Sequence, residues 1–171
     1  MISSAAFMSH QPVIDGFEFA SAGATQQGVL PLSGFARLRD MLASDAGDVA
    51  YKVRGVRDGR GRPGLQLSVQ CTLQLRCQRC LEPLAYEVQA ATLLVLAASQ
   101  AEIDADPTDA QAPDRVLAGK EMPLRELVED ELILALPYAP RHADCAAQAE
   151  LRDSAKASPF AELRQLMRDK H

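Results

Sequence analysis

The segment LQLSVQCTLQLRC, residues 65–77, alternates apolar and polar residues along its whole length. Each odd position holds an apolar residue or Cys, and each even position holds a polar residue. Because successive side chains of a β-strand point to opposite faces of a sheet, this pattern predicts a long strand with one buried face and one solvated face. Cys71 lies in the buried phase, where a free thiol behaves as a small apolar side chain.

Alternation of the same kind continues on both sides of this strand. Before it, apolar and polar residues alternate from Val49 to Val53 and are followed by the turn-forming run DGRGRPG at 58–64. After it, a turn that contains CQRC at 77–80 leads into a further alternating segment between residues 84 and 94. Alternating segments separated by such turns predict hairpins. We therefore expect an α+β fold built on an antiparallel β-meander rather than on βαβ units.

Helical spacing of apolar residues predicts two helices that cover this sheet. The first is expected over residues 33–44. The second begins at Pro123, which suits the first turn of a helix, and ends before Pro137. Its leucines and Val128 form the apolar face. Its acidic residues are expected on the solvent side: Glu126, Glu129 and Asp130.

The remaining segments carry weaker patterns. A short edge strand is expected around residues 13–19, and residues 100–114 indicate an exposed acidic loop because they contain no Lys or Arg. These elements predict one α+β domain over residues 1–140. Residues 141–171 are expected to form a loop with candidate metal ligands, a polar linker and a short amphipathic helix. The apolar stripe of that helix, which can dock on the chain's own core or on a partner, consists of Phe160, Leu163, Leu166 and Met167.

Composition and charge exclude several classes of protein. The chain has 171 residues, of which 47% are hydrophobic and 24% charged, so it is globular rather than wholly disordered. Aromatic residues make up 5% and Trp is absent, which argues against a platform that stacks RNA bases. With a formal net charge of -5, contact with a phosphate backbone requires a local basic patch. No segment has the apolar length of a signal peptide or a membrane helix, so we expect a cytoplasmic protein whose Cys residues are thiols or metal ligands.

One stretch of the chain is locally basic. It lies in and beside the first predicted turn, where Asp58 is the only acidic residue between Tyr51 and Gly64. Glycine lets a backbone approach closely, and guanidinium groups pair with phosphate in a bidentate manner. The stretch therefore predicts an RNA-binding surface, and a solvated tip that keeps the sheet edge soluble is the alternative interpretation. The candidate RNA-binding residues are Lys52, Arg54, Arg57, Arg60 and Arg62, together with Arg76 and Arg79 beside the second turn.

The spacing of Cys and His predicts a metal site. Cys77 and Cys80 are separated by two residues at a turn, so both thiolates can bind one ion, and His142 and Cys145 repeat this spacing downstream. Together they would form a tetrahedral site of three thiolates and one imidazole, which suits structural zinc. Leu81 stands where zinc knuckles often have Gly, and free thiols are the alternative. A thioredoxin-type dithiol would instead place the Cys pair at the start of a helix, whereas strands flank it here.

Three stretches resemble a known protein family. They are CQRC at 77–80, VEDELILALP at 128–137 and SPFA at 158–161. In this order they resemble the bacterial large ribosomal RNA subunit accumulation protein family, YceD, and the resemblance runs from about Tyr51 to the C-terminus. It implies a cytoplasmic bacterial protein that is needed for the synthesis, processing or stability of 23S ribosomal RNA and that has no catalytic activity.

These observations support one leading hypothesis and two alternatives. The leading hypothesis is a non-enzymatic ribosome-biogenesis factor that acts on 23S rRNA or its precursor. The second is a protein-binding adaptor that uses the C-terminal stripe to hold a ribosomal or processing protein and affects rRNA only indirectly. The third is a cytosolic dithiol redox protein built on Cys77 and Cys80. No phosphate loop, nucleophile elbow or zinc-hydrolase motif is present, so no catalytic residue, membrane contact or small-molecule substrate is predicted, and zinc is the only cofactor expected.

Overall fold

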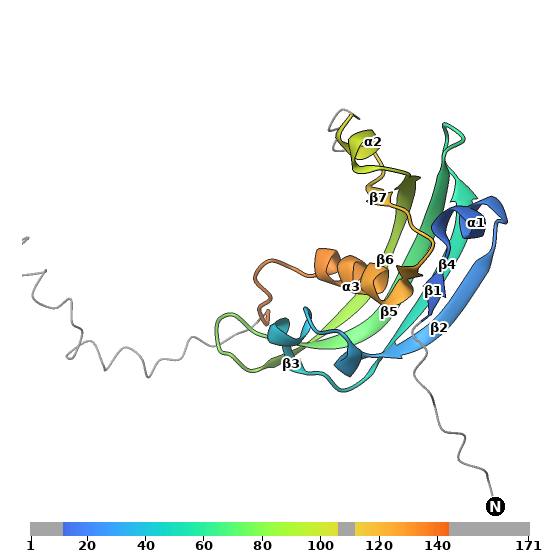
Figure 1. Ribbon diagram of the computed structural model, residues 1–171. Coiled ribbons are helices and arrows are strands. Elements are labelled where there is room, and N and C mark those ends of the chain that lie inside the picture. Colours follow the sequence, from blue (N-terminus) through green and yellow to red (C-terminus); the bar gives the residue numbers. More distant parts are fainter. Residues whose placement is uncertain (1–11, 106–111, 144–171) are drawn as a thin grey trace, which may run out of the picture.

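The computed structural model describes residues 12–105 and 112–143 of the protein. Strands dominate the described part of the chain, with short helices between them (Figure 1). In chain order the elements are β1 (Val13–Ile14), α1 (Gly16–Ser21), β2 (Thr25–Pro31), the 3-10 turns η1 (Leu32–Gly34) and η2 (Arg39–Met41), β3 (Leu42–Ser44), β4 (Asp48–Arg57), β5 (Pro63–Arg76), β6 (Pro83–Ala97), α2 (Gln100–Asp104), β7 (Arg115–Leu117), β8 (Met122–Pro123) and α3 (Leu124–Ala135).

The main sheet has six strands in the order β2-β4-β5-β6-β7, and β3 pairs with β5 beside this path. Neighbours from β2 to β6 are antiparallel, and their register places Lys52 opposite Gln27 and Ser68. This confirms the predicted antiparallel meander and the α+β class. Strand β7, which was not predicted, pairs with β6 in parallel. The sheet is strongly curved, and α3 lies in its concavity (Figure 1).

Strand β5 is the centre of the sheet, and its burial follows the alternation of its sequence. Leu65, Leu67, Leu73 and Leu75 are all at most 1% exposed and form the core beneath α3. The polar residues between them point to the opposite face, as predicted. Cys71 is half-buried, and desolvation raises the pKa of its thiol to about 11, so it stays a neutral part of the core edge.

The helix predicted over residues 33–44 is wrong. This segment forms η1, η2 and the short strand β3 instead. Its apolar residues still reach the core, because Phe35 and Leu38 are at most 1% exposed, but successive turns direct them there. The carboxylate of Glu129 explains the departure: its Oε1 accepts the backbone N–H groups of Arg37 (2.7 Å) and Leu38 (3.2 Å), which a helix would need for its own ladder.

The prediction that Glu129 lies on the solvent side of α3 is also wrong. Only 6% of Glu129 is exposed, and Arg37 Nε donates to its Oε2 at 3.1 Å. Arg37 Nη1 reaches Asp130 Oδ1 at 2.6 Å as well. The pKa of Arg37 is raised by its hydrogen bonds to Asp130 and Glu129. The predicted apolar face is confirmed at Leu124, Val128 and Leu132, which are fully buried. It is wrong at Leu134, which is 74% exposed near the end of the helix.

The edge strand predicted around residues 13–19 is wrong in its extent. Only Val13–Ile14 is extended, and Phe17 and Phe19 lie in α1, which Asp15 caps by accepting the Glu18 amide at 3.0 Å. The strand order of the main sheet ends at β2 and at β7 instead. Helix α1 packs directly on β4 at Gly55, where an added Cβ would lie 2.3 Å from the Phe19 carbonyl oxygen.

The acidic loop predicted over residues 100–114 contains a short helix where the structure describes it. Helix α2 spans Gln100–Asp104. Ser99 caps its N-terminus, because the Ser99 side chain accepts a hydrogen bond from the Glu102 amide. Arg115 Nη2 pairs with Glu102 Oε1 at 2.6 Å and ties α2 to β7. Among the residues that the structure describes, no helix is long and apolar enough to cross a membrane.

Candidate nucleic-acid interface and metal centre

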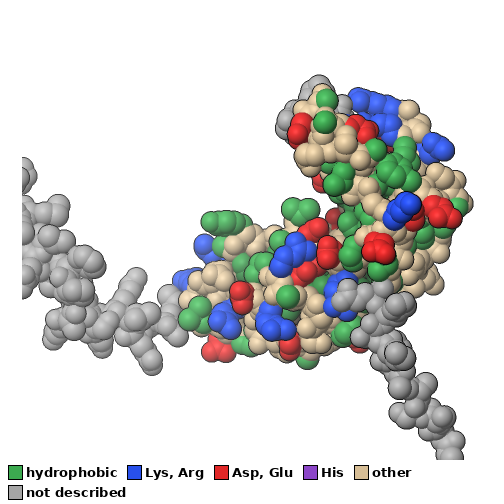
Figure 2. Space-filling model, in the orientation of Figure 1, with side chains coloured by type: hydrophobic (Ala, Val, Ile, Leu, Met, Phe, Trp, Pro, Cys, Tyr) green, Lys and Arg blue, Asp and Glu red, His purple; other side chains and the backbone are tan. Residues whose placement is uncertain are grey.

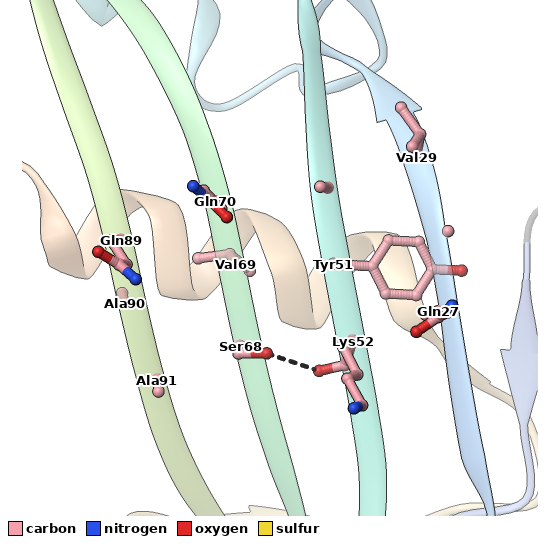
Figure 3. A pocket seen from close by; sticks show the side chains of 12 residues that line it. Gln27, Val29, Tyr51, Lys52, Ser68, Val69, Gln70, Gln89, Ala90 and Ala91 are labelled. Atoms are coloured by element: carbon pink, nitrogen blue, oxygen red, sulfur yellow. Dashed lines mark hydrogen bonds between the residues drawn. The ribbon is translucent and has the colours of Figure 1, made fainter.

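The face of the sheet opposite α3, here called the outer face, carries an open hollow of about 610 Å³. Figure 3 shows its centre, where side chains from β2, β4, β5 and β6 stand side by side with α3 behind the strands. The lining combines small apolar residues with polar ones, and Lys52 is its one charged residue. Its polar side chains are Gln27, Lys52, Ser68, Gln70 and Gln89.

Lys52 and Arg54 bring positive charge to the outer face. Both are exposed on β4. The register places Arg54 opposite Thr25 and Gln66, and the cross-strand neighbours of Lys52 are equally uncharged. Among the described residues, neither side chain forms an ion pair. Around α3, by contrast, Figure 2 shows acidic and basic side chains interspersed.

Asp58 organises the turn between β4 and β5. Its Oδ1 accepts the backbone N–H groups of Arg60 (2.9 Å) and Arg62 (2.7 Å), and its Oδ2 accepts Arg62 Nε at 2.8 Å. Burial opposes ionisation of this carboxyl, but the hydrogen bonds from Arg62 and Arg60 together lower its pKa. Arg57 Nη1 donates to the Gly61 carbonyl at 3.0 Å. Arg62 is therefore a structural member of the turn, and Arg57 and Arg60 are exposed beside it.

The basic residues predicted to bind RNA do not form one patch. Arg76 ends β5 and Arg79 follows it, whereas Arg57 to Arg62 precede the same strand. Strand β5 has 14 residues, and at about 3.3 Å per residue the path along it from one end to the other is roughly 40 Å. Lys52 and Arg54 lie between these ends, nearer to the first turn.

Sequence reasoning missed two residues of the outer face, Gln27 and Gln89. Both line the hollow together with Gln70, which the alternation of β5 had placed on the polar face. Gln27 was missed because β2 carries no apolar alternation that marks it as a strand. Gln89 was missed because only the pairing of β5 with β6 brings it opposite Gln70.

At the other end of β5, three candidate metal ligands meet. Cys77 and Cys80 lie in the turn between β5 and β6, and His142 follows α3. Their ligand atoms all lie within 4.8 Å of one another, and Cys80 Sγ is 3.4 Å from His142 Nδ1. Tetrahedral zinc, with bonds of about 2.3 Å to sulfur and 2.0 Å to nitrogen, would set such a pair about 3.5 Å apart. These side chains are thus close enough to hold a metal ion.

Backbone contacts bring the two ligand-bearing segments together. The Gln78 amide donates to the Pro140 carbonyl at 2.9 Å, across the gap between the turn and the segment after α3. His142 Nε2 lies 3.0 Å from the Pro83 carbonyl oxygen. Because that oxygen can only accept, Nε2 is the protonated nitrogen of the neutral ring, and Nδ1 faces the sulfur atoms.

The thiol of Cys77 is held in its ionised form. The backbone N–H of Cys80 donates to its sulfur, and against the opposing effect of burial the amides of Arg79 and His142 add to this, so that the pKa of Cys77 falls to about 5. The hydrogen bond with Cys77 raises the pKa of His142. A thiolate beside an imidazole is the pair of groups that a soft divalent ion requires.

Leu81 has the backbone conformation expected of glycine. Its φ of 66° makes it the only non-glycine residue with positive φ among those that the structure describes. Its amide donates to the Cys77 carbonyl at 2.9 Å and closes the turn. Leu81 thus adopts the left-handed conformation that Gly would adopt at this position, so its identity is no argument against a metal.

Two predictions fall on residues outside the described part of the chain. One is Cys145, expected as a fourth metal ligand. The other is the C-terminal helix with its stripe of Phe160, Leu163, Leu166 and Met167. Both stay predictions.

Comparison with known proteins identifies the family. No solved structure matches the chain. Residues 65–167 match the model of a family described as large ribosomal RNA subunit accumulation protein YceD. The match begins two residues into β5 and includes the rest of that strand, β6, α3 and all three of the clustered candidate ligands. On this match, which spans more than half of the chain, the protein belongs to the YceD family.

Proposed function

We propose that this protein is a non-enzymatic factor for accumulation of 23S ribosomal RNA and that its outer face contacts this RNA or its precursor directly. Membership of the YceD family supports the process. The observation that carries the direct contact is the position of Lys52 and Arg54, two exposed cations whose neighbours across the strands are all uncharged.

The chemistry of the outer face suits RNA despite the net charge of -5. Lys and Arg contact phosphates, and the amides of Gln70 and Gln89 can both donate to and accept from base edges and 2′-hydroxyl groups. Tyr51 is the one aromatic residue among those that line the hollow, and it is only 6% exposed. Its ring lies over Gly28, where an added Cβ would be 2.9 Å from the hydroxyl oxygen, so the ring is not open to stack on a base. Recognition therefore rests on hydrogen bonds and on a few phosphate contacts.

The adjacent turn extends this contact. Arg57 and Arg60 are exposed beside the outer face and can reach the RNA backbone. Arg62 belongs to the structure of the turn through its pair with Asp58. Contact through Lys52, Arg54, Arg57 and Arg60 gives at most a logarithmic salt slope of about -3 for single-stranded RNA, at roughly -0.7 per phosphate contact.

The test is ultraviolet crosslinking in growing cells, followed by stringent purification and sequencing of the attached RNA. Lys52→Gln with Arg54→Gln should remove crosslinks to 23S precursor sequence and prevent rescue of 23S rRNA levels in a deletion strain. The charge-matched control is Arg39→Gln with Lys120→Gln, which neutralises two exposed cations away from the outer face.

Two outcomes would reject this assignment. If the Lys52 and Arg54 variant is stable and crosslinks as well as the control, the outer face is not the contact surface. If the unaltered protein shows no RNA above background but carries a ribosomal or processing protein through purification, its effect on rRNA is indirect and the protein is an adaptor.

A further inference from the structure

We propose that Cys77, Cys80 and His142 hold one Zn²⁺ ion, which joins the turn between β5 and β6 to the segment that follows α3. The rRNA contact proposed above lies toward the other end of β5 and makes no use of these side chains. The inference therefore does not rest on the proposed function, and either can fail without the other.

The donor set selects the metal. Cys77, Cys80 and His142 offer sulfur and imidazole nitrogen, and no carboxylate belongs to the group within the described residues. Mg²⁺ and Ca²⁺ require oxygen ligands, so they are excluded. Two thiolates with an imidazole are typical of zinc, which takes up a tetrahedral arrangement without a redox change.

The surroundings are those of a prepared site. The Cys77 side chain is fully buried, and backbone N–H groups of Arg79, Cys80 and His142 point at its sulfur. The Pro83 carbonyl accepts from His142 Nε2 and so orients Nδ1 toward the sulfur atoms. A carbonyl on the far ring nitrogen is the usual outer contact of a metal-bound imidazole, because it fixes both the tautomer and the plane of the ring.

The position of the site defines its role. Cys80 and His142 are 62 residues apart in sequence, and within the described residues the hydrogen bond from Gln78 to Pro140 is the backbone link between their segments. An ion bound to both segments would close a long loop and hold the end of α3 against the β5–β6 turn. Such an ion is structural, and its binding free energy adds to the folding free energy.

The experiment begins with the full chain, purified under reducing conditions without added metal. Elemental analysis should find one zinc per chain. Exchange with Co²⁺ should give thiolate-to-cobalt charge-transfer absorption and the intense ligand-field bands of a tetrahedral ion. A strong chelator should lower the melting temperature, and added Zn²⁺ should restore it.

The matched variants are Cys80→Ser, which removes one ligand, and Cys71→Ser, which removes a thiol on β5 outside the cluster. Cys80→Ser should lose stoichiometric zinc, and Cys71→Ser should keep it. Zinc that is absent from the native protein, or that is retained equally by Cys80→Ser, would overturn the proposal. A Cys77–Cys80 disulfide in protein alkylated on cell lysis would overturn it in favour of a redox pair. Because the chelator measurement uses the native chain, the test holds even where a variant fails to fold.

Discussion

The two turns at the ends of β5 are similar in length but held in different ways. The first, from Asp58 to Arg62, is closed by one carboxylate and its own near neighbours, all within four residues of Asp58. The second, from Cys77 to Glu82, has backbone hydrogen bonds of its own but takes further partners from Pro140 and His142, beyond α3. In the sequence, the first turn is marked by its basic residues and the second by its two Cys residues.

The difference shows how local charge can mislead. In the first turn Arg62 is occupied by Asp58, so part of the apparent basic patch is internal structure. At the second turn, the side chains of Cys77 and Cys80 meet that of His142, with no carboxylate in the group within the described residues. A turn whose polar groups are hydrogen-bonded to one another needs no ligand, whereas sulfur and nitrogen donors that converge on one point indicate a ligand.

The largest effect is expected where α3 is anchored, because α3 carries the partner segment of the second turn. Glu129→Ala leaves the amides of Arg37 and Leu38 without an acceptor and should lower the free energy of unfolding by about 2–3 kcal/mol. Hydrogen exchange at the Gln78 amide should accelerate more than at the Arg62 amide. Asp130→Ala, which removes a half-exposed carboxylate, is the control and should cost less than about 1 kcal/mol. Equal acceleration at both turns would remove the distinction between them.

Asp58→Ala tests the first turn alone. Loss of the carboxylate should expose the Arg60 and Arg62 amides to faster exchange and leave the Gln78 amide unchanged. Lowering the pH tests the same carboxylate without a mutation. Since folding lowers the pKa of Asp58, its ionised form contributes stability above the unfolded pKa, and this is lost as the pH falls through the folded value. If exchange at Arg60 and Arg62 does not respond to either change, Asp58 does not organise the turn.

Each turn contains a residue with positive φ, and exchanging its type gives effects of opposite sign. Gly61, at φ 78°, has nothing within 4 Å of an added Cβ, so Gly61→Ala meets only backbone strain and should destabilise by about 1 kcal/mol. Gly59→Ala is the control, because Gly59 is equally open and has no positive φ. A cost no greater than that of Gly59→Ala would contradict the strain argument.

Leu81→Gly is the converse change in the second turn. It relieves the left-handed conformation of Leu81, which is 66% exposed and so contributes little burial. The gain, offset by the greater freedom of glycine in the unfolded chain, should be at most about 1 kcal/mol in chemical denaturation. Leu81→Ala keeps the strain and should show no gain. Stabilisation by Ala equal to that by Gly would point to removal of an exposed apolar side chain instead.

The smallest change in stability is expected on the outer face. Lys52→Gln with Arg54→Gln should alter the free energy of unfolding by less than about 0.5 kcal/mol, because neither cation has a charged partner within residues 12–105 and 112–143. Arg62→Gln should destabilise more, since it breaks the pair with Asp58. Chemical denaturation of both variants separates exposed cations from structural ones. Equal stability of the two would mean that the Asp58 pair contributes nothing measurable.

Much of the architecture was predictable because it repeats along the chain. The structure confirms the alternation in β5 and most of the apolar spacing in α3, because each pattern reflects which side of the element is buried. Residues 33–44 show the limit of this reasoning. Their helical spacing was real, but Phe35 and Leu38 reach the core from turns held by Glu129, which lies 91 residues beyond Leu38.

The candidate sites divide in the same manner. Residue types and short spacings in the sequence identified Cys77, Cys80 and His142 as candidate ligands and the stretch from Lys52 to Arg62 as basic. Tertiary contacts were needed to show that His142 meets the Cys pair and that Glu129 is buried. They also show that Arg62 is bound to Asp58, whereas Lys52 and Arg54 form no ion pair with the part of the chain that the structure describes. Which side chains of a strand share a face follows from the geometry of neighbouring peptide units, so the sequence alone determines it. The contact between Cys80 and His142, 62 residues apart, depends on where the chain lies after α3 has crossed the sheet. Only the packing of α3 in the core sets that position.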